Sequence, residues 1–399
     1  MEPKTVQRRF DLDWLRVLAI LAIFVFHSTR LFDTDDWSIK NPTSYAALDV
    51  WKEFAMTWGM PLILIISGAS VFYALNTVRT RTYLKGLFAR LFLPLVVGIF
   101  THVAFQVYLE DLQKGTFNGS FWQFYPHYFD GMYGFGGNFA WMGLHLWYLE
   151  MLFIFSLLFL PLFLWLKKTN SGRIVLHALG NLLAIPGAVF LFTVPAIILI
   201  IKLDPATWGN PDLGGWSILI YPFYFLSGFI IISNQQLQAR ICEMRWYSLV
   251  MGLVLSPVYL FLVFQTNYLA LSQLANAFAN PLRCLVAWSW LLTVLGFGMQ
   301  NLNFNSPFLK YANEAVLPFY ILHQTVIVVL GYFIVQWAIP DPLKFLLILI
   351  LSFFVIIGLY EFVVRRFNVM RFLFGMKLRA KYIEIQTEEI NLKEIARTM

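Results

Sequence analysis

Long apolar runs, each near 20 residues, recur along the whole chain and constrain its fold more than any other feature. A run of this length suits an α-helix that crosses the hydrocarbon core of a bilayer, where every backbone polar group must be bonded within the segment. Hydrophobic residues make up 59% of the 399 residues and charged residues only 13%, well below the share in soluble domains. The pattern therefore predicts an all-α, polytopic membrane protein.

The runs predict about ten transmembrane helices. They lie near residues 14–32, 55–76, 91–109, 145–166, 178–201, 216–233, 247–265, 282–300, 315–337 and 344–364. Lys and Arg residues cluster before the first run and after the second, fourth, sixth and tenth, whereas the opposite loops carry mostly isolated bases. Cytoplasmic loops collect Lys and Arg, so both termini are predicted to lie in the cytoplasm. We expect a multi-span domain over 1–366 in the cell membrane and a cytoplasmic tail over 367–399.

The net charge of +7 would suggest a nucleic-acid partner in a soluble chain. Here the bases lie in short loops between apolar runs, which favours lipid phosphates and an anionic cytoplasmic substrate as partners, with no nucleic acid. Cys242 and Cys284 have no spacing typical of a metal site or a disulfide framework, and we interpret both as packing residues. We find no metal-binding motif; His102 and His177 have no partners at ligand spacing and are interpreted as core or interfacial residues.

The first run carries two ionisable side chains, Arg16 and His27. They are eleven residues apart, about three helical turns, so they share nearly one face at a separation of about 16 Å along the axis. A cation near the hydrocarbon costs at least about 2.5 kcal/mol, so such groups usually face a protein interior or a water-filled path. Two alternatives stay open: snorkelling of Arg16 to the headgroups, and a structural hydrogen bond from His27 to a neighbouring helix.

Later runs hold further ionisable groups. His145 and Trp147 open the fourth run, and Glu150 follows His145 at a spacing that does not put both on one helical face. Glu150 lies in an apolar stretch, so it needs a partner or a proton. His323 lies in the middle of the ninth run, where packing with a structural hydrogen bond is the simplest explanation.

A basic segment that includes Arg81, Lys85 and Arg90 follows the second run. Stop-transfer is the default explanation of these charges, and binding of an anionic ligand is the alternative. Small residues at 67–70 in the second run predict close helix packing, and the sixth run repeats the Ser-Gly pattern at 227–228. The segment 110–143 is rich in aromatic residues and glycine, which fits either an interfacial belt or an entrance for a sugar-like acceptor.

Five segments, in the same order along nearly the whole chain, resemble the multi-pass membrane-bound acyltransferase 3 family. They are the Arg-x10-His pair of Arg16 and His27, PLILIISG in the second run, HLWYL from His145, FYFLSGFI in the sixth run and PFYILHQTVI in the ninth. The HLWYL motif and the basic segment most resemble those of the branch that includes the glucans biosynthesis protein C succinyltransferases. One departure is Leu87, which stands where many members carry a base; Lys85 and Arg81 are the candidate substitutes.

The resemblance implies transfer of an acetyl- or succinyl-type group from cytoplasmic acyl-CoA, a co-substrate and not a bound cofactor, to a hydroxyl of a glycan or small molecule. It implies His27 as general base and Arg16 as the fixed charge that meets CoA or the developing oxyanion. Binding of acyl-CoA would involve Arg16, Arg90, Lys85 and Arg81. We expect acceptor or supporting roles for the residues His145, Trp147, Glu150 and His323.

Two other classes of function remain as alternatives. A secondary transporter of a small polar or anionic solute also has many spans and intramembrane ionisable groups, although no two-fold repeat is apparent in the hydropathy. A non-enzymatic scaffold would not need Arg16 and His27 on one face. Movement of label from acyl-CoA to an acceptor separates the enzyme from both alternatives.

Overall fold

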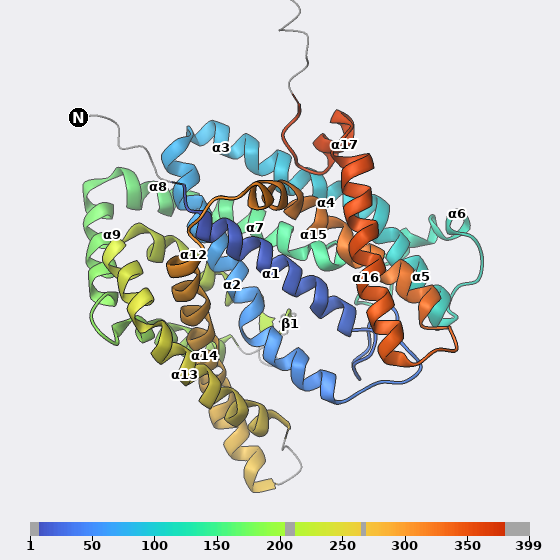
Figure 1. Cartoon of the computed structure of the whole chain (residues 1–399), viewed down its shortest axis with the longest axis horizontal. Coiled ribbons are helices and arrows are strands. Elements are labelled where there is room, and N and C mark those ends of the chain that lie inside the picture. The colour runs from blue at the N-terminus through green and yellow to red at the C-terminus, as the bar shows by residue number, and fades with distance from the viewer. Residues whose placement is uncertain (1–7, 204–211, 265–268, 380–399) are drawn as a thin grey trace, which may run out of the picture.

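The computed structural model describes residues 8–203, 212–264 and 269–379. The described chain is a bundle of helices with one short antiparallel hairpin, β1 (Asp212–Leu213) and β2 (Trp216–Ser217) (Figure 1). The first half holds α1 (Phe10–Thr29), α2 (Ala47–Thr77), α3 (Thr80–Leu87), α4 (Leu93–Gly98), α5 (Ala104–Lys114), α6 (Phe121–Phe124), α7 (Trp147–Leu158), α8 (Leu160–Lys168), α9 (Asn170–Leu183) and α10 (Thr193–Lys202). The second half holds α12 (Tyr221–Ser233), α13 (Gln235–Phe264), α14 (Leu269–Asn301), α15 (Pro307–Ile334), α16 (Asp341–Leu359) and α17 (Asn368–Leu373).

The helices confirm an all-α membrane protein. Within the described ranges, six helices are long and apolar enough to cross a membrane, and eight if each of two bent helix pairs is one span. Helix α1 does not belong to this set, and neither does α12, which is apolar but has only 13 residues. About ten spans and cytoplasmic termini therefore stay predictions.

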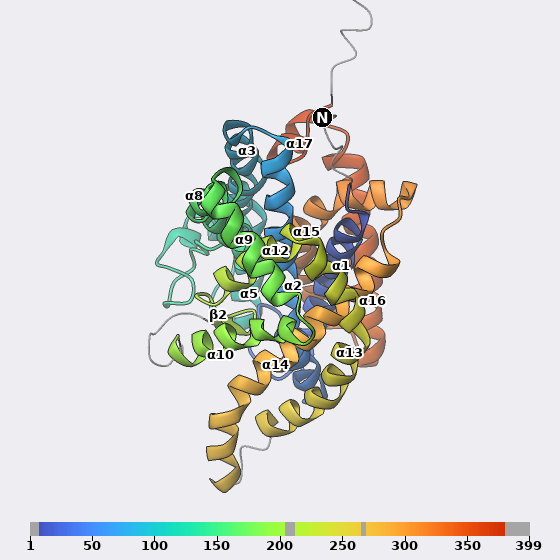
Figure 2. The same ribbon diagram turned by 90° about the vertical axis from the view of Figure 1, so that its left-hand side faces the viewer.

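Helix α1 packs against α2, α14, α15 and α16. Its first turn holds Asp11 and Asp13, whose charges complement the positive end of the helix dipole and pair with Arg9 and Arg8. The start of α1 and helix α17 lie at the same end of the molecule, which we call the terminal end (Figures 1 and 2). The axis of α1 thus places Arg16 nearer the terminal end and His27 farther from it.

The Ser-Gly pairs of α2 and α12 pack on each other. A Cβ atom added at Gly68 would lie 2.9 Å from the main-chain carbon of Phe225, and one added at Gly228 would lie 2.7 Å from that of Ile65. Only glycine fits at both positions, because real Cβ atoms do not approach backbone so closely. This confirms the close packing predicted for residues 67–70 and shows that the partner is the matching pair of α12.

The segment Thr80–Lys114 is one long helix with two π-helical parts, η1 (Phe88–Phe92) and η2 (Ile99–Val103). Pro94 has no amide hydrogen, so the carbonyl of Arg90 loses its usual i+4 partner inside this helix. The wider π turn of η1 accommodates that loss, and such turns are frequent at functional sites. Arg90 lies in η1 and His102 in η2.

The fifth run, predicted as a single span over 178–201, is bent by 118° between Asn170–Leu183 and Ala188–Lys202, where the 3₁₀ turn η5 (Ala188–Phe192) leads into α10. Pro186 and Gly187 interrupt the helix here, and Gly187 adopts a φ of 80°, so the single span over 178–201 stays a prediction. The fourth run is also bent, by 47°, between Leu144–Leu158 and Leu160–Lys168. Its bend precedes Pro161.

The segment after the last long helix folds back onto the bundle. Residues Tyr360–Val364 form the π turn η6, and α17 then packs against α4 and η6. Arg371 is buried and donates to Glu314 Oε1 at 3.0 Å and to the Lys377 carbonyl at 2.7 Å. Part of the segment predicted as a tail is thus attached to the bundle, whereas residues 380–399 lie outside the described ranges.

The aromatic segment between α5 and α7 forms its own small core. Helix α6, the turn η3 (His127–Phe129) and a bridge between Met132 and Phe139 hold it together. Tyr133 donates to Glu110 at 2.9 Å, and burial together with this carboxylate raises the pKa of Tyr133. Trp122 remains 78% exposed, so the segment combines ring packing with an open aromatic surface.

Candidate active site

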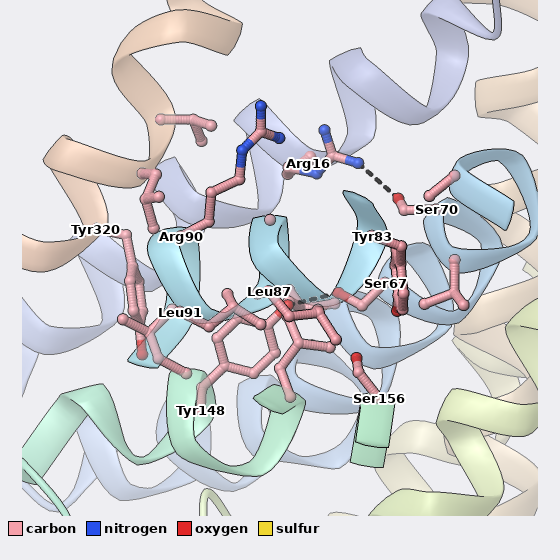
Figure 3. A pocket seen from close by; sticks show the side chains of 18 of the residues that line it. Arg16, Ser67, Ser70, Tyr83, Leu87, Arg90, Leu91, Tyr148, Ser156 and Tyr320 are labelled. Atoms are coloured by element: carbon pink, nitrogen blue, oxygen red, sulfur yellow. Dashed lines mark hydrogen bonds between the residues drawn. The ribbon is translucent and has the colours of Figure 1, made fainter. Parts of the chain in front are cut away.

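A cavity of about 640 Å³ lies at the terminal end between α1, α2, α3, η1, α7 and α15 (Figure 3). Its polar or charged lining residues are Arg16, Ser67, Ser70, Thr77, Thr82, Tyr83, Arg90, Tyr148, Ser156, Tyr320 and Lys377. The remaining wall is mostly aliphatic and includes Ile20, Leu87 and Val316. The cavity therefore combines a few polar groups with apolar walls, as small-molecule sites usually do.

Three cationic residues line this cavity: Arg16, Arg90 and Lys377. Arg16 donates to Ser70 Oγ at 2.7 Å, and to Asp13 Oδ1 and Asn313 Oδ1 at 3.3 Å each. These contacts hold its guanidinium in place from α1, α2 and α15. Figure 3 shows the guanidinium groups of Arg16 and Arg90 at one side of the cavity. Their charge suits an anionic ligand.

Two phenol rings that pack on each other, those of Tyr148 and Tyr320, also line the cavity. The hydroxyl groups of Tyr148 and Ser67 are 2.5 Å apart, and the rings of Tyr148 and Tyr320 have centroids 5.7 Å apart. Tyr320 donates its hydroxyl proton to the carbonyl of His145. Both rings are anchored by these bonds and both are buried, so they form a defined barrier.

Histidine side chains gather beyond this barrier. His27 Nδ1 lies 3.1 Å from His323 Nε2, and the ring of His323 lies edge-on to that of His145 with centroids 5.1 Å apart. His102 follows at 6.3 Å from His145. His323 is fully buried and His27 is only partly so, with Trp37 stacked near it at 6.2 Å. The bundle thus assembles imidazoles from α1, α15, η2 and the turn η4 (Leu144–Leu146).

Both residues of the Arg-x10-His pair meet α15, as their shared helical face predicts. Arg16 contacts Asn313 and His27 contacts His323, ten residues farther along that helix. His27 is not among the residues that line the cavity, whereas Ile20, two turns before it, is. Tyr320 lies on the cavity wall less than one turn before His323. The cavity and the histidine cluster are therefore neighbours: Tyr320 lines the cavity, its ring centroid lies 5.5 Å from that of His323, and Tyr148 packs beside it.

Four other predicted site residues do not line this cavity. Arg81 and Lys85 are exposed on α3 and do not line the cavity, so their predicted role in acyl-CoA binding stays a prediction. Trp147 packs against Tyr221 with ring centroids 5.4 Å apart, away from the lining. Glu150 is partly buried, and its Oε2 has no hydrogen-bond partner among the described residues.

Several residues of the site have no signal in the sequence that identifies their role. Tyr148 and Tyr320 lie within the quoted HLWYL and PFYILHQTVI segments, but their spacing does not indicate that they meet. Lys377 reaches the cavity only because the chain folds back after α17. His102 has no partner at ligand spacing in the sequence, and its neighbour in the cluster, His145, comes from the separate turn η4. Among the described residues, no three His, Cys, Asp or Glu side chains are arranged to hold a metal ion.

Comparisons with known proteins agree with this architecture. A family model described as an acyltransferase domain, that of the acyltransferase 3 family, matches residues 9–361. Curated proteins named glucans biosynthesis protein C, from Salmonella paratyphi B and Salmonella heidelberg, are each 23% identical over 93% of this chain and 95% of their own length. No solved structure matches the chain. The family model covers far more than half of the chain and does not favour the transporter alternative. The chain therefore belongs to the acyltransferase 3 family and is a membrane acyltransferase of groups other than aminoacyl groups.

Proposed function

We propose that this protein transfers an acetyl- or succinyl-type group from acyl-CoA, bound from the cytoplasm, to a hydroxyl of a glycan or small-molecule acceptor. The observation that carries the proposal is the juxtaposition of a cation-lined cavity and a histidine pair, with the ring of Tyr320 lining the cavity and lying 5.5 Å from that of His323. Such a pairing supplies one site for an anionic donor and a neighbouring base for the acceptor hydroxyl.

The donor site is the cavity at the terminal end. Phosphates of CoA would meet Arg16, Arg90 and Lys377, because guanidinium and ammonium groups form strong charge-assisted hydrogen bonds to phosphate oxygens. The aliphatic walls would contact the pantetheine arm. A volume of about 640 Å³ is within the range of ordinary ligand pockets and leaves part of the nucleotide at the mouth.

The reaction site lies at His27. A neutral imidazole there would take the proton of the acceptor hydroxyl as its oxygen attacks the thioester carbon. His27 is partly exposed while His323 is buried, so His27 is the member of the pair that an acceptor can reach. For the acyl group to arrive from the cavity, the rings of Tyr148 and Tyr320 have to move apart. The barrier then keeps water from the thioester when no transfer takes place.

The acceptor is proposed to be a saccharide that reaches His27 from the side opposite the donor. Two observations support this choice: the names of the curated relatives refer to glucans, and the aromatic segment with Trp122 offers open rings to a sugar. The ring of Trp37 beside His27 gives a further flat surface. Stacking of this kind would orient an acceptor without using charge.

The proposed orientation puts the terminal end of the bundle in the cytoplasm and the protein in the cell membrane. The start of α1 and helix α17 lie at one end, which suits termini on one side of the bilayer (Figure 1). The six long spans, two bent pairs, α1 and α12 together would account for about ten crossings. Cysteine-accessibility labelling of single sites in whole cells would test the orientation.

The direct test is a transfer assay with purified protein in lipid nanodiscs, labelled acetyl-CoA or succinyl-CoA, and a purified glucan. We expect label on the glucan, and we expect Arg16→Ala to weaken acyl-CoA binding by at least about tenfold through loss of charge-assisted bonds. The matched control is Arg173→Ala, which removes an exposed arginine outside the cavity lining. Absence of transfer from either donor, or equal donor affinity in the two variants, would count against the proposal.

A further inference from the structure

The contact between His27 and His323 specifies which nitrogen of each ring carries hydrogen. His323 Nδ1 lies 2.5 Å from the main-chain oxygen of Tyr320. A carbonyl oxygen can only accept a hydrogen bond, so Nδ1 of His323 must be the donor. A neutral imidazole has one N–H, and Nε2 of His323 therefore holds a lone pair. That lone pair faces His27 Nδ1 at 3.1 Å.

The ring of His27 must then donate from Nδ1, which leaves its Nε2 as the unprotonated nitrogen. The opposite assignment would need a doubly protonated His323. Such a cation would be fully buried, and the hydrogen-bond partners recorded for this ring within the described ranges are a carbonyl and an imidazole, neither of them a carboxylate. A buried charge without an opposite charge is strongly disfavoured. Both imidazoles are therefore neutral, and the hydrogen bond runs from His27 Nδ1 to His323 Nε2.

We infer that His323 is a positioning residue that holds His27 in the tautomer whose Nε2 accepts a proton. This inference rests on the proposed function, since it assigns a role in acyl transfer. During attack the acceptor hydroxyl proton moves to His27 Nε2, the oxygen bonds to the acyl carbon and the carbon–sulfur bond breaks. The same nitrogen then returns the proton to the CoA thiolate, so the products are ester and free thiol. His323 stabilises the transient imidazolium by accepting from Nδ1.

The surroundings of His323 fix its ring. Tyr320 donates to the carbonyl of His145, and His145 Nε2 lies 3.0 Å from the carbonyl of Ile321. In the first bond α15 donates to η4, and in the second η4 donates to α15, so the two bonds tie η4 to the turn of α15 that carries His323. The ring of His145 stands perpendicular to that of His323, with an interplanar angle of 90°. His145 therefore supports the site by fixing α15, and it does not need to contact either substrate.

Two substitutions separate positioning from packing. His323→Gln keeps an acceptor oxygen that can face His27 Nδ1, whereas His323→Leu fills space without an acceptor. We expect His323→Leu to lower kcat about 10- to 100-fold with little change in KM for acyl-CoA, as loss of a hydrogen bond to a charged group predicts. His323→Gln should recover most of that loss. His177→Gln, at an exposed histidine, is the control.

Nitrogen NMR of the protein labelled with ¹⁵N only in histidine reports the tautomer directly, in nanodiscs and without substrate. We assign the His27 signals by their loss in His27→Gln. We expect a protonated Nδ1 and an unprotonated Nε2 in the wild type and in His323→Gln, and the other tautomer or a mixture in His323→Leu. A protonated Nε2 on neutral His27 in the wild type would overturn the inference, as would equal kcat in the Leu and Gln variants. Failure of the wild type to transfer any acyl group would contradict the proposed function. The NMR result on the His27 tautomer is obtained without substrate, so it does not depend on that outcome.

Discussion

The glycine contact between α2 and α12 gives a stability prediction whose magnitude follows from the structure. Alanine at Gly68 or Gly228 would place its Cβ against main-chain atoms of the other helix, which cannot swing away as a side chain would. Gly59 lies on the same α2 helix, and a Cβ there would meet nothing within 4 Å. The three substitutions therefore share the same gain in helix propensity, about 1 kcal/mol, and differ only in the packing cost.

Overpacking typically costs about 1–3 kcal/mol, and contact with rigid backbone favours the upper part of that range. We expect Gly68→Ala and Gly228→Ala to be less stable than Gly59→Ala by about 3 kcal/mol in the free energy of unfolding. Titration with SDS in mixed micelles, followed by tryptophan fluorescence, measures this difference. Activity should fall too, because Ser67 and Ser70 flank Gly68 and contact Tyr148 and Arg16. If Gly68→Ala and Gly228→Ala unfold at the same SDS concentration as Gly59→Ala, or at a higher one, the close packing of α2 against α12 is contradicted.

Four further substitutions, at three residues, test the cavity. Tyr148→Ala should raise hydrolysis of acyl-CoA in the absence of acceptor, whereas Tyr148→Phe, which removes only the hydroxyl bonded to Ser67, should raise it much less; release of free CoA measures both. Lys377→Ala should weaken acyl-CoA binding several-fold at low salt and less at high salt, as titration calorimetry at two ionic strengths would show. Arg371→Ala should remove the shorter of the two ion pairs of Glu314, loosen the segment that carries Lys377 and raise KM for acyl-CoA more than it lowers kcat, as steady-state kinetics would show.

The sequence predicts the all-α class and the position of Arg16 and His27 on one helical face, because hydropathy and helical period are local properties. The bend at Pro186 and Gly187 does not appear in the hydropathy, since apolar residues continue on both sides of it. Local patterns also cannot tell which face of α15 meets α1. The contact between His27 and His323 therefore needs the folded chain.

Long-range contacts account for the remaining parts of the site. Residues 67–70 indicate close packing by their small size, but only the structure identifies α12 as the partner. Lys377 reaches the cavity through a reversal of the chain at Gly375, whose φ of 67° and contact with Arg90 depend on the tertiary fold. His102 joins the histidine cluster although nothing near it in the sequence suggests a partner.

The central claim is that donor binding and proton transfer take place at two neighbouring places along α1. One comparison tests it most directly: acyl-CoA affinity and the rate of acyl transfer are determined together for His27→Ala and for the wild type in nanodiscs. We predict wild-type affinity, because His27 does not line the cavity, together with a transfer rate lower by about 10²- to 10⁴-fold. A folded His27→Ala protein that transfers the acyl group at close to the wild-type rate would contradict the account.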